Sequence, residues 1–162
     1  MSTSKTEVGP QDHVPSNPLD VIPVEMPFDV PYGMAISLDR AEAAVQAAVT
    51  EAKKRNWKMN IAVADWGGNL VVFKRMDGAM LASIQIAIHK ARAAATFRRP
   101  TNVFEEGINL MHLNYLLAFD GVIASRGGIP LIDNGKIIGA IGCSGGTDSQ
   151  DEVVSMAGAA VV

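Results

Sequence analysis

Apolar residues recur with helical spacing in the first half of the chain. After Ser37, a residue type that favours the N-cap position, apolar residues follow at intervals of three or four as far as Ala52. A second pattern of the same kind begins at Ser83 and continues to Ala95, with polar side chains on its opposite face. Both segments are therefore predicted to be amphipathic helices that cover an apolar core.

Two further helices are predicted in the second half. Pro100 disfavours helix at the residue before it, so a third helix is expected to start at Thr101 or Asn102 and to end near Tyr115. Ser149 and Glu152 have the spacing of a capping box, which predicts a last helix from Ser149 to the end of the chain.

Short alternating or apolar runs bounded by turn residues predict five strands. The turn signals Trp66–Asn69 and Asp133–Gly135 indicate that neighbouring strands form antiparallel hairpins. Hairpins combined with helices favour the α+β class, an antiparallel sheet with helices packed on its faces. The predicted strands are Met59–Asp65, Leu70–Arg75, Gly121–Ser125, Ile129–Ile132 and Lys136–Ile141.

The first 35 residues differ from the rest, because they hold six of the eight prolines. Proline lacks the N–H donor that helices and central strands use, so residues 1–35 are predicted to form an extended arm and residues 36–162 the folded domain. A disordered tail is the alternative. Apolar residues between the prolines favour an arm that packs on a neighbouring subunit or on its own domain.

Composition excludes several classes of function. The formal charge of −3 disfavours a nucleic-acid binder, and no apolar run reaches the length of a membrane-spanning helix. The N-terminus has no apolar signal core, so a cytoplasmic location is expected. The single cysteine, Cys143, excludes an internal disulfide and is predicted to be a buried, unreactive thiol.

Two histidines are candidate ligands of a haem iron. His89 and His112 each lie on a predicted helix, and neither belongs to a zinc-type histidine pair. Imidazole suits iron, and haem often takes a single axial histidine. The alternative for each is a surface or hydrogen-bonded histidine.

Charged residues gather near the end of one predicted strand and on the helix that follows. Arg75 and Asp77 come first, and His89, Lys90 and Arg92 follow, so we expect a polar mouth that includes Arg75, Asp77, His89 and Lys90. Lysine and arginine bind carboxylates, whether the propionates of haem or a small organic acid. The alternative is a solvated helix face.

Arg126 adds a cation next to Gly127 and Gly128, where a backbone without side chains lets a ligand approach. We therefore include these three residues among the candidate ligand-binding groups.

Several segments together resemble the GlcG/HbpS family, which is also known from the PduO C-terminal domain. They cover about residues 36–160 and leave the arm out. The matching segments are Met76–Gly78, Ser83–Ala91, Gly127–Leu131, Gly139–Gly146, Gln150–Glu152 and Ala157–Gly158.

The resemblance implies a profilin-like α+β fold with a five-stranded antiparallel sheet, and a homo-oligomer built from dimers. Some relatives bind haem, and others accompany catabolic operons. Haem or a related tetrapyrrole is therefore the expected ligand, with Thr101, His89 and His112 as candidate axial ligands by residue type and Lys90 or Arg126 near the propionates.

The alternative function is a catabolic enzyme, a tautomerase, hydratase, lyase or dehalogenase acting on a small unsaturated organic acid. In that case Arg75, Arg92 or Arg126 would hold the carboxylate, and His89 or Asp77 would transfer protons.

Overall fold

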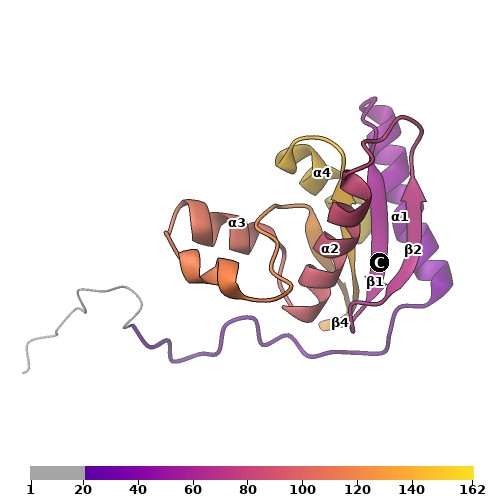
Figure 1. Cartoon of the computed structure of the whole chain (residues 1–162). Coiled ribbons are helices and arrows are strands. Elements are labelled where there is room, and N and C mark those ends of the chain that lie inside the picture. The colour runs from indigo at the N-terminus through magenta and orange to yellow at the C-terminus, as the bar shows by residue number, and fades with distance from the viewer. Residues whose placement is uncertain (1–20) are drawn as a thin grey trace, which may run out of the picture.

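A single antiparallel sheet organises the fold, as shown by a computed structural model that describes residues 21–162 (Figure 1). Within these residues the sheet has four strands in the order β2-β1-β4-β3. The strands are β1 (Asn60–Asp65), β2 (Leu70–Arg75), β3 (Gly128–Asp133) and β4 (Lys136–Ser144). The helices are α1 (Leu38–Lys54), α2 (Ser83–Thr96), α3 (Asn102–Asn109), the 3-10 helix η2 (Asn114–Ala118) and α4 (Asp148–Ala159).

Successive side chains of the central strands alternate between the two faces of the sheet, and each face packs against a different layer of helices. Ile61 and Val63 of β1 pack with α1 and with Val154 of α4, whereas Ala62 and Ala64 face α2. Successive residues of a strand point to opposite faces, so both faces of β1 are buried. The protein is therefore a three-layer α+β domain, which confirms the predicted class.

Small residues let α2 lie very close to the sheet. A Cβ added to Gly142 of β4 would come within 2.2 Å of the Ala87 carbonyl oxygen and 2.5 Å of the Ala91 nitrogen. Ala87 and Ala91 themselves are fully buried. The glycines and alanines of this layer are thus needed for the helix to approach the strands.

Both predicted hairpins are confirmed. β1 pairs antiparallel with β2 across the Trp66–Asn69 turn, and β3 pairs antiparallel with β4. Asn134 and Gly135 both have positive φ, 48° and 75°, as the tight turn between β3 and β4 requires.

The prediction of five strands is wrong in one element. Gly121–Ser125 is irregular and forms no strand: Gly121 lies in a turn, Ser125 in a bend, and residues 122–124 have no regular structure. Side chains of the helices, and not a neighbouring strand, contact this segment. Ser125 Oγ donates to Asp148, and His89 Nε2 lies 3.1 Å from the Gly121 carbonyl oxygen. These side-chain contacts fix the position of the segment without the backbone hydrogen bonds of a strand pair.

Two helix boundaries also differ from the prediction. The third helix ends at Asn109, and His112 has a φ of 56°, a left-handed conformation that separates α3 from η2. The predicted capping box of Ser149 and Glu152 is wrong: Thr147 and Gln150 form it, so the last helix begins at Asp148. Ser37 caps α1 as predicted, since its side chain accepts from the Arg40 N–H.

Residues 21–35 of the arm contain no helix and no strand longer than an isolated bridge; residues 1–20 of the predicted arm lie outside the described part. Tyr32 bridges Ile137 in parallel, and its hydroxyl donates to the carbonyl oxygens of Ala95 and Thr96. The end of the arm thus packs on its own domain. In residues 21–162 no helix has both the length and the apolar character to cross a membrane.

We expect Gly142→Ala to lower the free energy of unfolding by about 3 kcal/mol, because the added methyl group overlaps the α2 backbone. Urea unfolding followed by circular dichroism measures the change. Gly67→Ala is the matched control, since the atoms nearest its added Cβ are the side-chain ends of Asn69 and Asp65 in the turn and not backbone atoms. Equal effects of the two substitutions would show that α2 can move away from the sheet.

Candidate functional site

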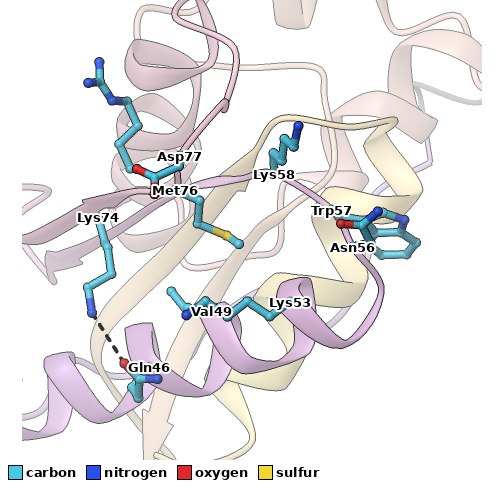
Figure 2. A pocket seen from close by; sticks show the side chains of 10 residues that line it. Gln46, Val49, Lys53, Asn56, Trp57, Lys58, Lys74, Met76 and Asp77 are labelled. Atoms are coloured by element: carbon cyan, nitrogen blue, oxygen red, sulfur yellow. Dashed lines mark hydrogen bonds between the residues drawn. The ribbon is translucent and has the colours of Figure 1, made fainter.

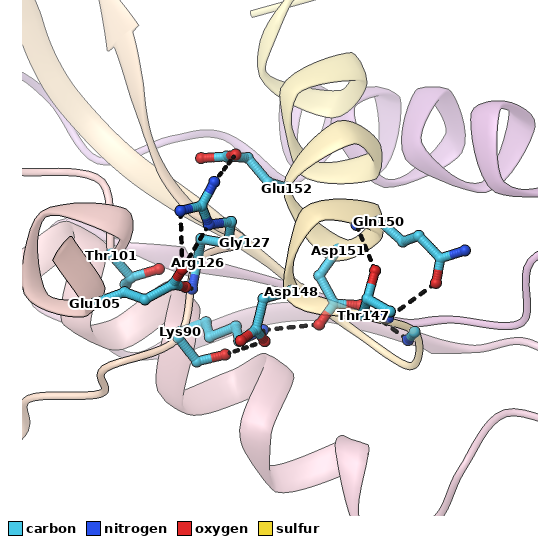
Figure 3. A network of polar contacts seen from close by, with 12 residues as sticks. Lys90, Thr101, Glu105, Arg126, Gly127, Thr147, Asp148, Gln150, Asp151 and Glu152 are labelled. Atoms are coloured by element: carbon cyan, nitrogen blue, oxygen red, sulfur yellow. Dashed lines mark hydrogen bonds and ion pairs between the residues drawn. The ribbon is translucent and has the colours of Figure 1, made fainter. Parts of the chain in front are cut away.

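A buried ion pair joins α2 to α4. Lys90 Nζ lies 2.8 Å from Asp151 Oδ2, and the two side chains are 1% and 2% exposed (Figure 3). The second carboxylate oxygen of Asp151 accepts from the Gly146 N–H at 3.0 Å. Each charge therefore has a close partner in a place that water does not reach.

Gly127 and Gly128, at the start of β3, pack against this ion pair. Ser155 Oγ donates to the Gly127 carbonyl at 2.6 Å, and the Gly128 N–H donates to Thr101 Oγ1 at 2.9 Å. A Cβ on Gly128 would approach the Lys90 carbonyl oxygen to 2.4 Å. Gly127, Gly128 and Thr101, predicted as ligand-binding residues, are here parts of a buried network, and Thr101 is fully buried.

Burial raises the pKa of Asp151, while the charge of Lys90 and its hydrogen bond act in the opposite direction. Asp148 lies farther out, with Oδ1 3.8 Å from Lys90 Nζ and a half-exposed side chain. Lys90 thus has two carboxylates around it. Its ammonium group is already occupied within the protein and does not face solvent, where a propionate or organic acid would arrive.

Arg126 is held by three glutamates. Its guanidinium contacts Glu105 at 2.8 Å, Glu152 at 3.4 Å and Glu106 at 3.8 Å. The hydrogen bond and the charge of Glu105 raise the pKa of Arg126. This predicted ligand-binding cation therefore links α3 and α4 to the loop before β3.

Arg75 and Asp77 line a cavity of about 400 Å³ between the end of α1 and β2 (Figure 2). Both side chains are exposed. The other lining residues are Gln46, Val49, Lys53, Asn56, Trp57, Lys58, Lys74 and Met76.

His89 and Arg92 line a different cavity, of about 330 Å³, together with Gln85, Ile88, Asp120 and Gly121. A carbonyl oxygen only accepts hydrogen bonds, so the contact of His89 Nε2 with the Gly121 oxygen requires a proton on that nitrogen. Arg92 Nε donates to the Gly68 carbonyl oxygen at 3.3 Å.

The predicted polar mouth is wrong. Arg75 and Asp77 share one cavity, His89 lines another, and Lys90 is buried against Asp151. The prediction failed because neighbours on a helix point in different directions: His89 faces the Gly121 loop, while Lys90 points to α4.

His112 stands on the surface in the segment between α3 and η2. Within residues 21–162 no hydrogen bond holds its ring. Large apolar side chains around it in the sequence are 48% to 73% exposed: Leu110, Met111, Tyr115, Leu117 and Phe119. An accessible imidazole is thus combined with apolar surface. Figure 1 shows α3 and the chain after it projecting from the side of the sheet.

Sequence reasoning missed the partner of Lys90 and the lysines of the first cavity. Asp151 lies 61 residues after Lys90 in the sequence, and Lys53 lies in the last turn of α1. Lys58 and Lys74 come from other elements, so no spacing in the sequence connects them. In the described part of the chain, no group of three or more histidine, cysteine or acidic residues is placed to hold a metal ion.

The fold, the glycine turns and the buried lysine define the chain as a three-layer α+β domain with a buried ion pair, and comparison with known proteins identifies the family. Residues 36–160 match the family described as "Haem degrading protein HbpS-like". The chain belongs to this family, as the resemblance in the sequence indicated.

Individual relatives agree with this membership. The chain is 41% identical to protein GlcG of Escherichia coli K12 over 109 residues, which cover 67% of this chain and 81% of GlcG. The crystal structure of HbpS is 30% identical with a TM-score of 0.75, and covers 83% of this chain and 94% of HbpS. A crystal structure described as a PduOC:heme complex is 26% identical with a TM-score of 0.71, and covers 80% and 96% of the two chains.

We expect Lys90→Met to lower the free energy of unfolding by about 3–5 kcal/mol, because it leaves Asp151 buried without its counter-charge. The double variant Lys90→Met/Asp151→Leu should be more stable than Lys90→Met alone, since no buried charge remains. Urea unfolding of both variants measures this. Arg55→Gln is the control, because it breaks an exposed ion pair and should change stability little. A double variant less stable than the single one would contradict this account.

Burial raises the pKa of the Cys143 thiol to about 12, so at pH 8 almost none of it is the reactive thiolate. We expect the native protein to react with Ellman's reagent roughly a thousandfold more slowly than the urea-unfolded chain. Absorbance at 412 nm follows both reactions. Rapid labelling of the native protein would show that Cys143 is accessible.

Proposed function

We propose that this protein binds haem or a related tetrapyrrole at the surface between α3 and η2, with His112 as the axial ligand of the iron. The observation that carries the proposal is the combination of an exposed imidazole with exposed apolar side chains in the same segment. A porphyrin needs an apolar surface for its ring and a nitrogen lone pair for its iron.

Tyr115 and Phe119 support this assignment, because their rings meet edge to face at 5.7 Å and remain about half exposed. The family description and the haem complex of a relative of the same fold support haem as the ligand class. Haem bound here would supply an iron centre whose reactivity depends on its axial ligand.

The other candidate axial ligands fit less well. The Nε2 atom of His89 carries its proton toward the Gly121 oxygen, which leaves only Nδ1 with a lone pair for iron. Thr101 is buried, and its hydroxyl oxygen accepts from Gly128. His112 is free of such contacts within the described residues.

The catabolic-enzyme alternative loses support from the geometry. Of the three arginines proposed to hold a carboxylate, Arg126 is held by glutamates, and Arg92, which shares a cavity with His89, donates to the Gly68 carbonyl oxygen. Arg75 shares a cavity with Asp77 but not with His89, so the proposed proton-transfer residues lie in two separate cavities. We therefore favour haem binding over acid–base chemistry on an organic acid.

Self-association into a homo-oligomer built from dimers is part of the proposal, as is a cytoplasmic location. Apolar side chains of the arm support self-association, because Val24, Met26 and Met34 are more than 70% exposed in the single chain. Exposed apolar surface of this kind often marks contacts between subunits.

We expect a titration with hemin to produce a saturable Soret band with about one haem per chain. His112→Ala should shift or abolish this band, and added imidazole should restore it, because imidazole replaces the missing ligand. His89→Ala is the matched control and should keep the spectrum. Absence of a saturable band in the unaltered protein would refute haem binding. An unchanged spectrum in His112→Ala would refute only the choice of ligand.

A further inference from the structure

The cavity between α1 and β2 gathers positive charge from three parts of the chain. Lys53 comes from the last turn of α1, Lys58 from the connection to β1, and Lys74 and Arg75 from β2. Asp77 is the single carboxylate among the lining residues given above. Four cations against one anion leave this cavity with a formal charge of +3, in a chain whose net charge is −3.

Within the part of the chain that the structure describes, these four cations have no carboxylate partner. Among residues 21–162, no ion pair within 4.0 Å involves Lys53, Lys58, Lys74 or Arg75, although carboxylates pair with five other cations of the domain: Arg40, Arg55, Lys90, Arg98 and Arg126. Repulsion among like charges in one cavity is unfavourable without a counter-charge. An anionic ligand would remove this repulsion.

The cations stand at several points around the cavity. Lys74 Nζ donates to Gln46 Oε1 of α1 at 3.4 Å, whereas the Lys58 ammonium group lies on the other side of Met76, next to Gly78 (Figure 2). Figure 2 also shows the Lys53 side chain extended along α1 toward Val49.

Val49 and Met76 form an apolar patch between Lys74 and Lys58 in Figure 2, and both residues belong to or contact the main apolar core. The Lys53 ammonium group ends beside Val49, so a cation also borders this patch. The cavity thus combines cations with an apolar patch, which suits a small molecule that has more than one negative charge and an apolar body.

We propose that this cavity binds a small organic dicarboxylate whose two carboxylates are joined by an apolar spacer. The lysines neutralise the two carboxylates, and the amide groups of Gln46 and Asn56 add hydrogen-bond donors. Inorganic phosphate fits less well, because it has no apolar body to cover Val49 and Met76.

The proposal is independent of haem binding. Its residues belong to α1, β2 and the connection before β1, whereas the proposed haem ligand lies after α3. Failure of either site would therefore leave the other unaffected, and the two are tested with different ligands.

Trp57 provides a direct readout, since it lines the cavity. The sequence contains one other tryptophan, Trp66, so Trp66→Phe leaves Trp57 as the single fluorophore. Adipate is the probe, and hexanoate is the matched monocarboxylate with the same number of carbons. We expect adipate to change the fluorescence saturably and to bind about tenfold more tightly than hexanoate or inorganic phosphate.

The variant Lys53→Gln/Lys74→Gln, made in the same background, should weaken adipate binding about tenfold, because each substitution removes one cation from the cavity. Lys54→Gln is the matched control: it removes the same charge from the same helix but does not line the cavity, so binding should change less than twofold. Circular dichroism verifies that the variants are folded.

Three outcomes would overturn the proposal. The first is the absence of any saturable change with adipate. The second is phosphate or hexanoate binding as tightly as adipate, which would remove the need for two carboxylates and a spacer. The third is an equal loss of affinity in Lys54→Gln, which would mean that adipate responds to general surface charge and not to this cavity.

Discussion

The buried pair of Lys90 and Asp151 is the interaction on which the arrangement of this domain depends. It connects α2 on one face of the sheet with the first turn of α4, and the turn at Gly127 and Gly128 closes over it. Two charges in a dry environment are stable only while each has its partner and its hydrogen bonds. The pair therefore requires that α2, α4 and the start of β3 take one relative position. Any rearrangement that separated these elements would leave a buried charge without its partner, which is strongly unfavourable.

The charged residues of the domain fall into two groups, those paired within the protein and those without a partner among the described residues. Lys90, Arg126 and the carboxylates around them are occupied in holding elements together, and their charges are neutralised within the protein. The cations between α1 and β2, by contrast, take part in no such connection. The segments that resemble the HbpS-like family include Lys90, Gly127 and Gly128, which belong to this structural network. The proposed ligand-binding surfaces lie in more peripheral segments.

Those peripheral segments have distinct chemical characters. The region after α3 presents an imidazole with aromatic and aliphatic side chains, and Figure 1 shows that this part projects from the sheet. The cavity between α1 and β2 presents ammonium and guanidinium groups around Val49 and Met76. A flat apolar ligand and a small charged one would therefore meet different surfaces of the same domain. The close packing of α2 on Gly142 keeps the scaffold between them rigid.

Local features were predictable from the sequence because they depend on neighbours along the chain. The cap at Ser37, the β3–β4 turn at Asn134, the start of α2 and the burial of Cys143 follow from spacing, turn chemistry and apolar runs. Gly121–Ser125 was predicted wrongly because side chains from distant elements, and not a second strand, hold its backbone.

The sequence by itself determined the helices, the hairpins, the α+β class and the family. Tertiary structure alone decided which charges meet. His89 and Lys90 are adjacent in the chain, yet one lines a surface cavity and the other is buried against Asp151, 61 residues away. Helix rotation sends adjacent side chains to different neighbours, and the partners of each come from elements that only folding brings close.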